Sequence, residues 1–358
     1  MQKVLHIFNG LQTGGVESFV ITLQKALCND GIQFDFLLRT TENDAQKIAY
    51  FSERGSHIFI TSPWQKHPLK NYREMKRFFA AHRDAYDFIH IHANSLAYFL
   101  PIQFAATYMK RAKIIVHSHN TRGSGSVADM LHYIHKVRLA HYTVTNLACS
   151  DAAGKWLFSK SYTVIPNSID AERYRITAGD VQQRNAAVVL LVSVGRLTRQ
   201  KNYDFALAVM KLLRDDGLAF HYAIAGDGDL RPALEEKIRR LGLQNQVTLL
   251  GNVADIPALL KTKHIFLMPS LFEGLSIALL EAQCSGIASV IADTIPQEGV
   301  LCDNVHRIPL EERVWAETIK AICQQENFGF NAHNTDIIAE SPFGLAGLRK
   351  TMLTVYTN

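Results

Sequence analysis

The segment Ser270-Leu-Phe-Glu-Gly-Leu-Ser-Ile-Ala-Leu-Leu-Glu-Ala-Gln-Cys-Ser-Gly286 follows the short apolar run Ile265–Met268 and reads as a strand, a tight loop and a helix. Ser276 is a suitable N-cap for that helix, because an apolar-periodic run follows it. Gly274 lets the backbone of the loop come close to a ligand. We therefore predict an anion site at the positive end of the helix dipole, formed by the free backbone N–H groups of Leu275, Ser276 and Ile277.

Two carboxylates flank this predicted anion site. Glu273 lies in the loop, and Glu281 lies about one and a half turns into the helix, so both can face a ligand held at the helix start. A phosphate held between carboxylates that accept hydrogen bonds from hydroxyl groups suits a nucleotide sugar. The alternative is that Glu273 only interacts favourably with the helix dipole and that Glu281 is solvated.

The length and composition indicate a soluble protein of two domains. A chain of 358 residues is longer than one hydrophobic core usually serves, and 47% hydrophobic with 20% charged residues is ordinary for a globular protein. We see no signal peptide and no apolar run of about eighteen residues, and so we expect a cytosolic protein. The five cysteines are scattered without a C-x-x-C pair, which argues against a disulfide framework or structural zinc.

The positive charge is concentrated in the first half of the chain. Residues 1–165 carry 19 lysines and arginines against 11 aspartates and glutamates, whereas the remainder carries 19 against 22. This asymmetry predicts an anionic partner or an anionic membrane surface near the first domain. Nucleic acid is excluded as a partner, because the sequence contains no recognised module and no basic stripe interleaved with aromatic residues.

Short apolar runs alternate with amphipathic segments of helix length along the whole chain. This alternation predicts βαβ units, a parallel sheet in each domain and ligands at the carboxyl ends of the strands. The strands expected in the first half are Val4–Phe8, Ile32–Leu38, His57–Ile60, Phe88–His92, Lys113–His117, Leu147–Cys149 and Tyr162–Ile165. The helices expected there are Glu17–Asn29, Tyr72–His82, Leu96–Met109 and Val127–His141.

Two loops of the first half are candidate ligand sites. Gly14 and Gly15 follow the first strand, but their spacing from Gly10 is not G-x-G-x-x-G, which disfavours a nicotinamide or flavin site. His117 and His119 end a later strand on one face, where a metal is conceivable. We do not expect one, because no third ligand stands at a recognisable spacing. His90 and His92 are interpreted as structural histidines.

The helix expected over Val127–His141 carries apolar residues beside Lys136 and Arg138. A basic amphipathic helix of this kind can lie on a membrane surface. The alternative is a helix whose apolar side faces the core and whose basic side is solvated.

In the second half, Arg196 and Lys201 follow the apolar run Val188–Val194, and Asn202 is expected to cap the next helix. Two cations at the carboxyl end of a strand suit a diphosphate, whereas Arg199 is expected to be solvated. The strands expected next are Phe220–Ala225, Gln246–Leu250, His264–Met268 and Ala288–Ile291.

Glu273 and Glu281, in the setting Phe-Glu-Gly-Leu-Ser, resemble the E-x7-E signature of family 4 of the retaining glycosyltransferases. This resemblance implies an α/β protein of the GT-B fold, with two Rossmann-like domains, a cleft between them and a last helix that returns to the first domain. It also implies that Glu273 and the amides that follow hold the donor sugar and diphosphate and that Glu281 holds the ribose hydroxyls. The amides in question are those of Gly274, Leu275 and Ser276.

Other loops carry the same resemblance. Arg196 and Lys201 match the cations that hold the donor diphosphate, and Gly15 matches a glycine that lies against the donor phosphate or the acceptor. His119 matches a histidine near the reacting carbon, with His117 as the fallback. Gly226 belongs to the family's A-G-x-G loop, and we therefore reject a metal site at the D-x-D formed by the neighbouring aspartates Asp227 and Asp229.

The resemblance also sets the expected domain boundaries. The segment Ile165-Pro-Asn-Ser-Ile-Asp170 is similar to the family's interdomain P-N-G-I-D segment. We therefore expect an acceptor-binding domain over 1–165 with the helix 343–358, and a nucleotide-sugar-binding domain over 166–342. The apolar spacing of Leu345, Leu348, Met352 and Val355 predicts that last helix.

We therefore predict a retaining glycosyltransferase that uses a nucleotide sugar, with UDP favoured, and no metal or other cofactor. The resemblance implies a glycan or lipid-linked glycan acceptor in capsular or exopolysaccharide synthesis and contact with the cytoplasmic face of the membrane. The alternatives are a nucleotide-sugar epimerase or phosphorylase of the same fold and a non-catalytic subunit.

Overall fold

The computed structural model describes residues 1–12, 15–120, 126–177 and 188–357. The chain divides into two compact units, of which unit 1 contains 1–167 and 348–358 and unit 2 contains 168–347. No helix within the described ranges is both long enough and apolar enough to cross a membrane.

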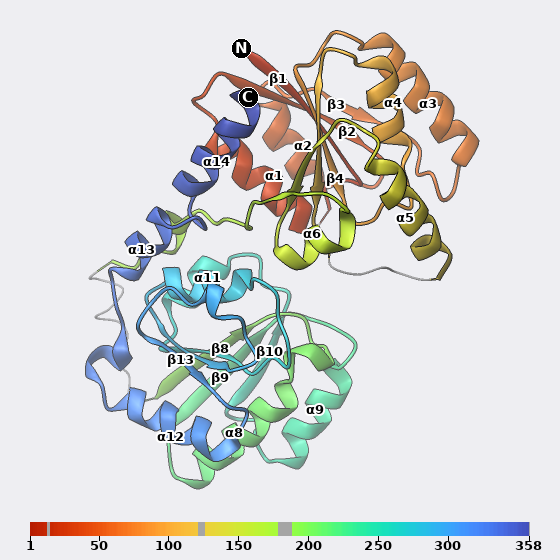
Figure 1. The fold of residues 1–358 in the computed structure, drawn as a ribbon. Coiled ribbons are helices and arrows are strands. Elements are labelled where there is room, and N and C mark those ends of the chain that lie inside the picture. Colours follow the sequence, from red (N-terminus) through yellow and green to blue (C-terminus); the bar gives the residue numbers. More distant parts are fainter. Residues whose placement is uncertain (13–14, 121–125, 178–187, 358) are drawn as a thin grey trace. The chain divides into compact units, whose positions relative to one another are not determined.

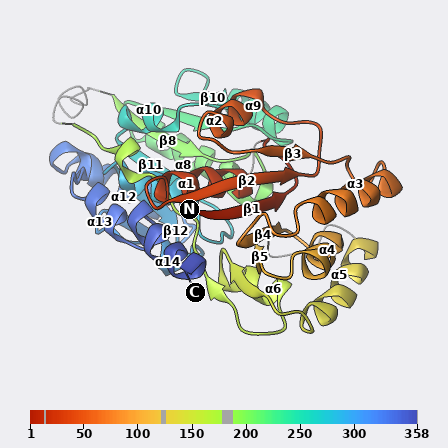
Figure 2. The same ribbon diagram turned by 90° about the horizontal axis from the view of Figure 1, so that it is seen from above.

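Unit 1 is built around a seven-stranded parallel sheet with the strand order β3-β2-β1-β4-β5-β6-β7 (Figures 1 and 2). Its strands are β1 (Gln2–Phe8), β2 (Ile32–Leu38), β3 (Ile58–Ile60), β4 (Phe88–Ala93), β5 (Lys113–Ser118), β6 (Thr145–Ala148) and β7 (Thr163–Val164). Its helices are α1 (Gly15–Ala26), α2 (Ala45–Ser52), α3 (Pro68–Ala81), α4 (Leu100–Tyr108), α5 (Ser126–Leu139) and α6 (Asp151–Leu157).

The two faces of this sheet differ in chemistry. On β1, Leu5 and Ile7 are fully buried in an apolar cluster with side chains of α3 and α4. The alternate residue His6 points to the other face, as the two-residue period of a strand requires. That second face is covered by α1 and by the last helix, α14 (Leu345–Thr357) (Figure 1).

The last helix belongs to unit 1 through its buried aromatic end. Tyr356 is fully buried, its ring meets those of Phe34 and Phe88, and its hydroxyl lies 2.7 Å from Nδ1 of His90. The expected return of the C-terminal helix to the first domain is therefore confirmed.

Unit 2 is built around a six-stranded parallel sheet with the order β10-β9-β8-β11-β12-β13. Its strands are β8 (Val189–Val194), β9 (Phe220–Ala225), β10 (Val247–Gly251), β11 (Ile265–Met268), β12 (Ala288–Ala292) and β13 (Val305–Ile308). Its helices are α8 (Tyr203–Asp215), α9 (Arg231–Arg240), α10 (Ile256–Lys261), α11 (Ile277–Cys284), α12 (Glu312–Cys323) and α13 (Asn334–Glu340), with 3₁₀ turns at Ala171–Tyr174, Arg199–Lys201, Gln297–Gly299 and Glu326–Gly329.

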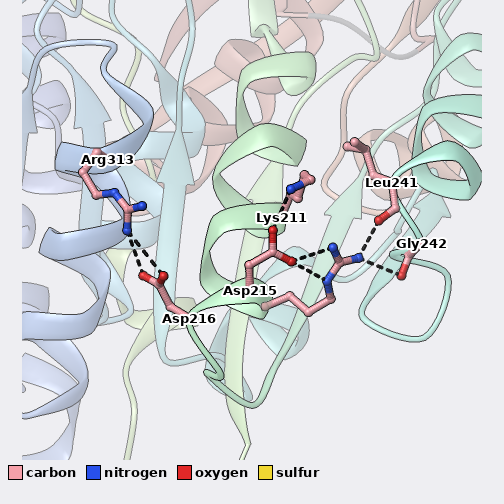
Figure 3. Close-up of polar contacts among 7 residues, drawn as sticks. Lys211, Asp215, Asp216, Leu241, Gly242 and Arg313 are labelled. Atoms are coloured by element: carbon pink, nitrogen blue, oxygen red, sulfur yellow. Dashed lines mark hydrogen bonds and ion pairs between the residues drawn. The ribbon is translucent and has the colours of Figure 1, made fainter.

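Ion pairs hold the C-terminal end of α8 against its neighbours (Figure 3). Asp216 accepts hydrogen bonds from Arg313 (3.0 Å) and Lys320 (2.6 Å) of α12. Asp215 pairs with Lys211 and Arg214, and Arg214 also donates to two backbone carbonyls, those of Leu241 and Gly242. Exposed pairs of this kind contribute little stability each, so the buried apolar sides of α8 and α12 provide most of the attachment.

Both sheets have a point at which the strand order reverses, between β1 and β4 in unit 1 and between β8 and β11 in unit 2. Loops leave such a point in opposite directions, and ligands of open α/β sheets bind in the crevice that this creates. Most residues singled out in the sequence follow β1, β8 or β11. The fold thus places them at the expected positions within each unit.

Candidate active site

The loops after β8 and β11 meet in unit 2. The two strands are paired neighbours, with Ile265 opposite Leu191 and Phe266 opposite Val192. The loop after β8 carries the predicted cations, and the loop after β11 carries Glu273. The amide of Leu271 donates to the carbonyl of Gln200 at 2.9 Å and ties the two loops together.

Lys201 and Glu273 form an ion pair between these loops. Nζ of Lys201 lies 2.6 Å from Oε1 of Glu273, and the side chains are only 17% and 10% exposed. Gln200 donates to the other carboxylate oxygen of Glu273 at 3.3 Å and to the carbonyl of Phe272 at 3.0 Å. A partly buried ion pair needs such additional hydrogen bonds to offset the loss of hydration. Glu273 is therefore held in one position before any ligand arrives.

Arg196 lies in the same loop after β8 as Lys201, and its charge is uncompensated among the described residues. It is exposed, and no carboxylate pairs with it in the part of the chain that the structure describes. An unpaired guanidinium with five N–H donors suits an anion with several oxygens.

Helix α11 begins after Ser276, which has extended backbone angles (φ −85°, ψ 114°) and is buried. The predicted helix start is thus correct, but the Ser276 side chain makes no capping hydrogen bond. The N–H groups of the first turn are left to other partners, as an anion site requires. A Cβ placed on Gly274 would meet no atom within 4 Å, so the backbone there borders open space.

Glu281 receives a hydrogen bond from a residue that precedes unit 2's sheet. The hydroxyl of Tyr174 donates to Oε1 of Glu281 at 2.6 Å. Burial raises the pKa of Glu281 above its ordinary value, while the Tyr174 hydrogen bond acts in the opposite direction. The Glu281 carboxylate is therefore oriented and largely withdrawn from water.

A separate cavity lies in unit 1 at the reversal between β1 and β4. Its volume is about 620 Å³, within the range of small-molecule sites. Gly15 and His119 both line it, so the structure brings these two predicted residues together. Gly14 lies outside the described residues.

The sequence matches two family descriptions in succession, "Glycosyltransferase Family 4" over residues 13–173 and "Glycosyl transferases group 1" over residues 180–329. It is 31% identical over 336 residues to EpsF of Bacillus subtilis (strain 168), in an alignment covering 89% of this chain and 87% of EpsF. The chain belongs to glycosyltransferase family 4. The predicted family and the predicted activity class, a glycosyltransferase, are thereby confirmed.

Two further likenesses extend over nearly the whole chain. A capsular polysaccharide biosynthesis glycosyltransferase, CapH of Staphylococcus aureus, is 24% identical over 353 residues, or 93% of this chain and 94% of CapH. The crystal structure of Anabaena HepE in complex with UDP and glucose matches with a TM-score of 0.75 at 18% identity and covers 100% of both chains. The likeness to HepE confirms the predicted GT-B fold.

The structure adds two details to the predicted donor loops of this family 4 member. Asn202 stands at the start of α8, but it has a left-handed backbone (φ 54°) and makes no capping hydrogen bond, so the predicted cap is wrong. Gly226 has a φ of +139°, and a Cβ there would lie 2.1 Å from the carbonyl oxygen of Gly195. Close packing of two loop backbones therefore explains this glycine, and its contact with a donor stays a prediction.

We interpreted His90 and His92 from the sequence as structural histidines. In the structure they lie close to His117 and His119. Register pairing places His92 opposite His117, and nitrogen atoms of His92, His117 and His119 lie within 4.8 Å of one another. A third imidazole is thus present beside the predicted pair. It comes from a neighbouring strand, which sequence spacing does not reveal.

Arg39 is a cation in the unit 1 cavity, and it was not among the residues predicted from the sequence. It follows β2 and lines the cavity, and its guanidinium carbon lies 5.0 Å from the ring centroid of Tyr98. Its Nε is buried without a hydrogen-bond partner, and burial lowers the pKa of Arg39. No carboxylate pairs with it among the described residues. The sequence did offer one signal for this role, because Arg39 is a cation that directly follows the expected strand Ile32–Leu38.

Tyr174→Phe tests the environment of Glu281. Burial raises the pKa of Glu281 in the folded chain above its value in the unfolded chain. The protonated carboxyl group therefore contributes to folding stability below the unfolded pKa, and this contribution is lost as the pH rises through the folded pKa. Removing the Tyr174 hydrogen bond raises the folded pKa further. We expect the variant's deficit in unfolding temperature to be larger at pH 7.5 than at about pH 4.

Tyr222→Phe is the matched control, because the hydroxyl of Tyr222 meets Ser193 Oγ at 2.7 Å and no carboxylate. Its deficit should be the same at both pH values. A deficit of Tyr174→Phe that is equally independent of pH would contradict the assigned environment of Glu281.

Proposed function

We propose that the protein is a retaining glycosyltransferase that moves a sugar from a UDP-sugar to a lipid-linked glycan in the synthesis of a capsular or extracellular polysaccharide. The observation that carries this proposal is the assembly of Arg196, the Lys201–Glu273 pair and the start of α11 at the carboxyl ends of β8 and β11. The UDP bound to HepE and the pathway in the name of CapH support the choice of donor and product.

Different residues of unit 2 bind different parts of the donor. Arg196 and the N–H groups at the start of α11 bind the diphosphate, and Glu281 accepts hydrogen bonds from the ribose hydroxyls. Lys201 has three N–H donors, so it can keep its bond to Glu273 and still donate to a phosphate oxygen. Glu273, fixed by Lys201 and Gln200, accepts from the hydroxyls of the transferred sugar.

These positions favour the departure of the nucleotide. Breaking the bond between the anomeric carbon and the phosphate oxygen develops negative charge on the diphosphate and positive charge on the sugar. Arg196, Lys201 and the helix start stabilise the first charge without rearrangement. The acceptor hydroxyl oxygen then bonds to the anomeric carbon on the side that the phosphate leaves, and its proton passes to a phosphate oxygen. This step retains configuration and needs no enzymic nucleophile.

We propose that transfer requires no metal ion. The diphosphate charge is offset by Arg196 and Lys201, which take the place that a divalent cation occupies in other phosphate-binding sites.

Arg196→Ala should lower kcat for transfer by about 10²-fold or more, because it removes charge stabilisation at the leaving group. Arg199→Ala is the matched control, since Arg199 is an exposed arginine three residues away in the same loop. The measurement is transfer of radiolabelled sugar from UDP-sugars to lipid-linked glycans by the purified protein. Equal losses in both variants would contradict the assigned role of Arg196.

The same assay, together with calorimetry, separates the alternatives. An epimerase would convert the UDP-sugar without an acceptor, and Glu273→Ala should abolish any true transfer. A non-catalytic subunit would bind no nucleotide sugar in calorimetry.

An anionic acceptor fits the cavity of unit 1. Arg39 supplies an unpaired cation, and Glu17 supplies one carboxylate that can accept from a sugar hydroxyl. Trp64 and Tyr98 also line the cavity, with rings stacked at 17° and centroids 5.2 Å apart. A sugar that carries a phosphate or diphosphate has matching groups: hydroxyls, apolar ring faces and charge.

Arg39→Gln should weaken the binding of farnesyl diphosphate about tenfold or more, because it removes a charged hydrogen-bond donor. Calorimetry in saturating UDP keeps the unit 2 site filled, so that the titration reports on the remaining site. Arg77→Gln, an exposed arginine of α3, should bind like the wild type. Failure of the wild type to bind, or equal weakening in both variants, would rule out Arg39 as the phosphate contact.

Helix α5 favours contact with a membrane. Its apolar residues Val127, Met130, Ile134 and Val137 are between 55% and 69% exposed, whereas His132 and Leu139 face the protein. The alternative in which this apolar side faces the core is therefore wrong. Arg138 is exposed on the same helix, whereas Lys136 is turned to the protein and donates to the backbone carbonyls of Lys155 and Trp156. Unit 1 is also the basic half of the chain. A bilayer with anionic headgroups matches both the stripe and the charge.

We propose that this contact is with the cytoplasmic face of the membrane. All five cysteines are free thiols in the structure, as is usual in a reducing compartment.

Ile134→Ser should weaken binding to vesicles containing phosphatidylglycerol by at least about tenfold, because it removes apolar surface from the proposed contact. Leu69→Ser, on α3, is the control at another exposed apolar residue. Co-sedimentation measures both. Concentration-dependent dimerisation with no vesicle binding would show instead that the stripe binds a second copy.

A further inference from the structure

Five histidines of unit 1 share one face of the sheet beneath the cavity. His6 lies on β1, His90 and His92 on β4, His117 on β5, and His119 directly after β5. The register places His6 opposite His90 and His92 opposite His117. Phe19 of α1 covers the rings of His92, His117 and His119.

Their ring nitrogens form two separate chains. In the first, Nδ1 of His6 lies 3.0 Å from Nε2 of His92, and Nδ1 of His92 lies 2.9 Å from Nε2 of His119. In the second, the Tyr356 hydroxyl lies 2.7 Å from Nδ1 of His90, and Nε2 of His90 lies 3.2 Å from Nδ1 of His117. Only the first chain ends at His119.

All five rings are neutral at pH 7. Burial lowers the pKa of His6 and His119 to about 3 and lowers the pKa of His90, His92 and His117 well below 6.5. Each ring therefore carries one proton, and it donates from one nitrogen and accepts at the other.

This geometry leaves the first chain two arrangements. Every link joins Nδ1 of one ring to Nε2 of the next, so the three protons must all be on Nδ1 or all on Nε2. In the first case His119 presents an N–H at its Nδ1, and in the second it presents a lone pair. Nδ1 of His119 has no hydrogen-bond partner among the described residues, and His119 lines the cavity.

The chain cannot conduct a proton. Its inner end, Nε2 of His6, is buried and has no hydrogen-bond partner. A proton that left His119 could not be replaced through His6, and a positive charge in this surrounding of Phe34 and Phe36 rings would lack a counter-ion.

We propose that His6 and His92 are positioning residues that lock the tautomer of His119 to their own, so that His119 meets a ligand in the cavity as a neutral group that cannot exchange its donor and acceptor nitrogens independently. Its proton position then depends on two buried rings and not on the ligand alone. In the proposed transfer reaction, His119 would accordingly orient a sugar oxygen and would not act as the acid or base. Only that last consequence rests on the proposed function.

Two-bond ¹H–¹⁵N correlation spectra of the full chain, labelled at its histidine rings, test the lock without any substrate. The method distinguishes the tautomers, and each ring is assigned by substituting it. His132 serves as an internal reference, because its Nδ1 accepts from the amide of Leu96 and its Nε2 donates to the carbonyl of Trp156. We expect His6, His92 and His119 to share one tautomer in the wild type. Unlike tautomers among the three would overturn the proposal.

His92→Phe should break the lock, and the His119 signals should move to positions averaged between the two tautomers. His90→Phe is the matched control, because His90 stacks on His92 with centroids 4.3 Å apart but belongs to the other chain. The control should leave the His119 tautomer unchanged. Equal effects of both variants, or no effect of either, would show that His92 has only a packing role.

Titration of the same wild-type sample with Zn²⁺ tests the competing interpretation. Both ring nitrogens of His92 and Nε2 of His119 are occupied by hydrogen bonds, so the signals of these two rings should not change at one equivalent of Zn²⁺. Stoichiometric binding that shifts His92, His117 and His119 together would identify a metal site and overturn the lock. Transfer assays give a separate readout, in which His92→Phe should lower kcat about tenfold more than His90→Phe does.

Discussion

The reversal of strand order between β8 and β11 is the constraint on which the arrangement of unit 2 depends. It brings together two loops that are 72 residues apart in the chain, and the Lys201–Glu273 ion pair joins them at 2.6 Å. Since both side chains are largely buried, removing either would leave an unpaired charge in a dry environment. The pair therefore fixes the loops and at the same time shapes the site between them.

Charge is distributed differently in the two candidate sites. In unit 2, Lys201 pairs with Glu273, while Arg196 has no carboxylate partner within the described ranges, which favours an anion at one defined place. In unit 1, Arg39 is unpaired and partly withdrawn from water beside Tyr98, and the histidines nearby are neutral because they are buried. Both sites thus hold one uncompensated guanidinium. At Arg39, which is partly withdrawn from water, that arrangement is costly for an empty protein, and at both arginines it is understandable if the site receives a phosphate.

Much of the fold could be predicted from sequence, because apolar runs and helical periodicity are local signals. The strands of unit 1 lie within three residues of their expected positions, and the helix at Ser276 starts where its neighbours indicate. Glu273, Lys201 and Arg196 were readable because each follows a strand. Local signals fail where tertiary contacts decide. The sequence left open which side of α5 is exposed, and it did not show the left-handed backbone of Asn202.

Contacts across strands could not be predicted in the same way. The bond from Tyr174 to Glu281 spans 107 residues, and that between His92 and His119 depends on the register of β4 and β5. A sequence offers residue types at these positions but not their partners. Partners determine whether a carboxylate is solvated or oriented and whether a histidine is a packing residue or part of a chain of hydrogen bonds.

A crystal structure of the protein with UDP tests the central claim most directly. We expect the diphosphate within hydrogen-bonding distance of Arg196, of Lys201 and of the backbone N–H groups that begin α11, and the ribose hydroxyls on Glu281. UDP bound elsewhere, or bound here with its phosphates away from Arg196 and Lys201, would contradict the account.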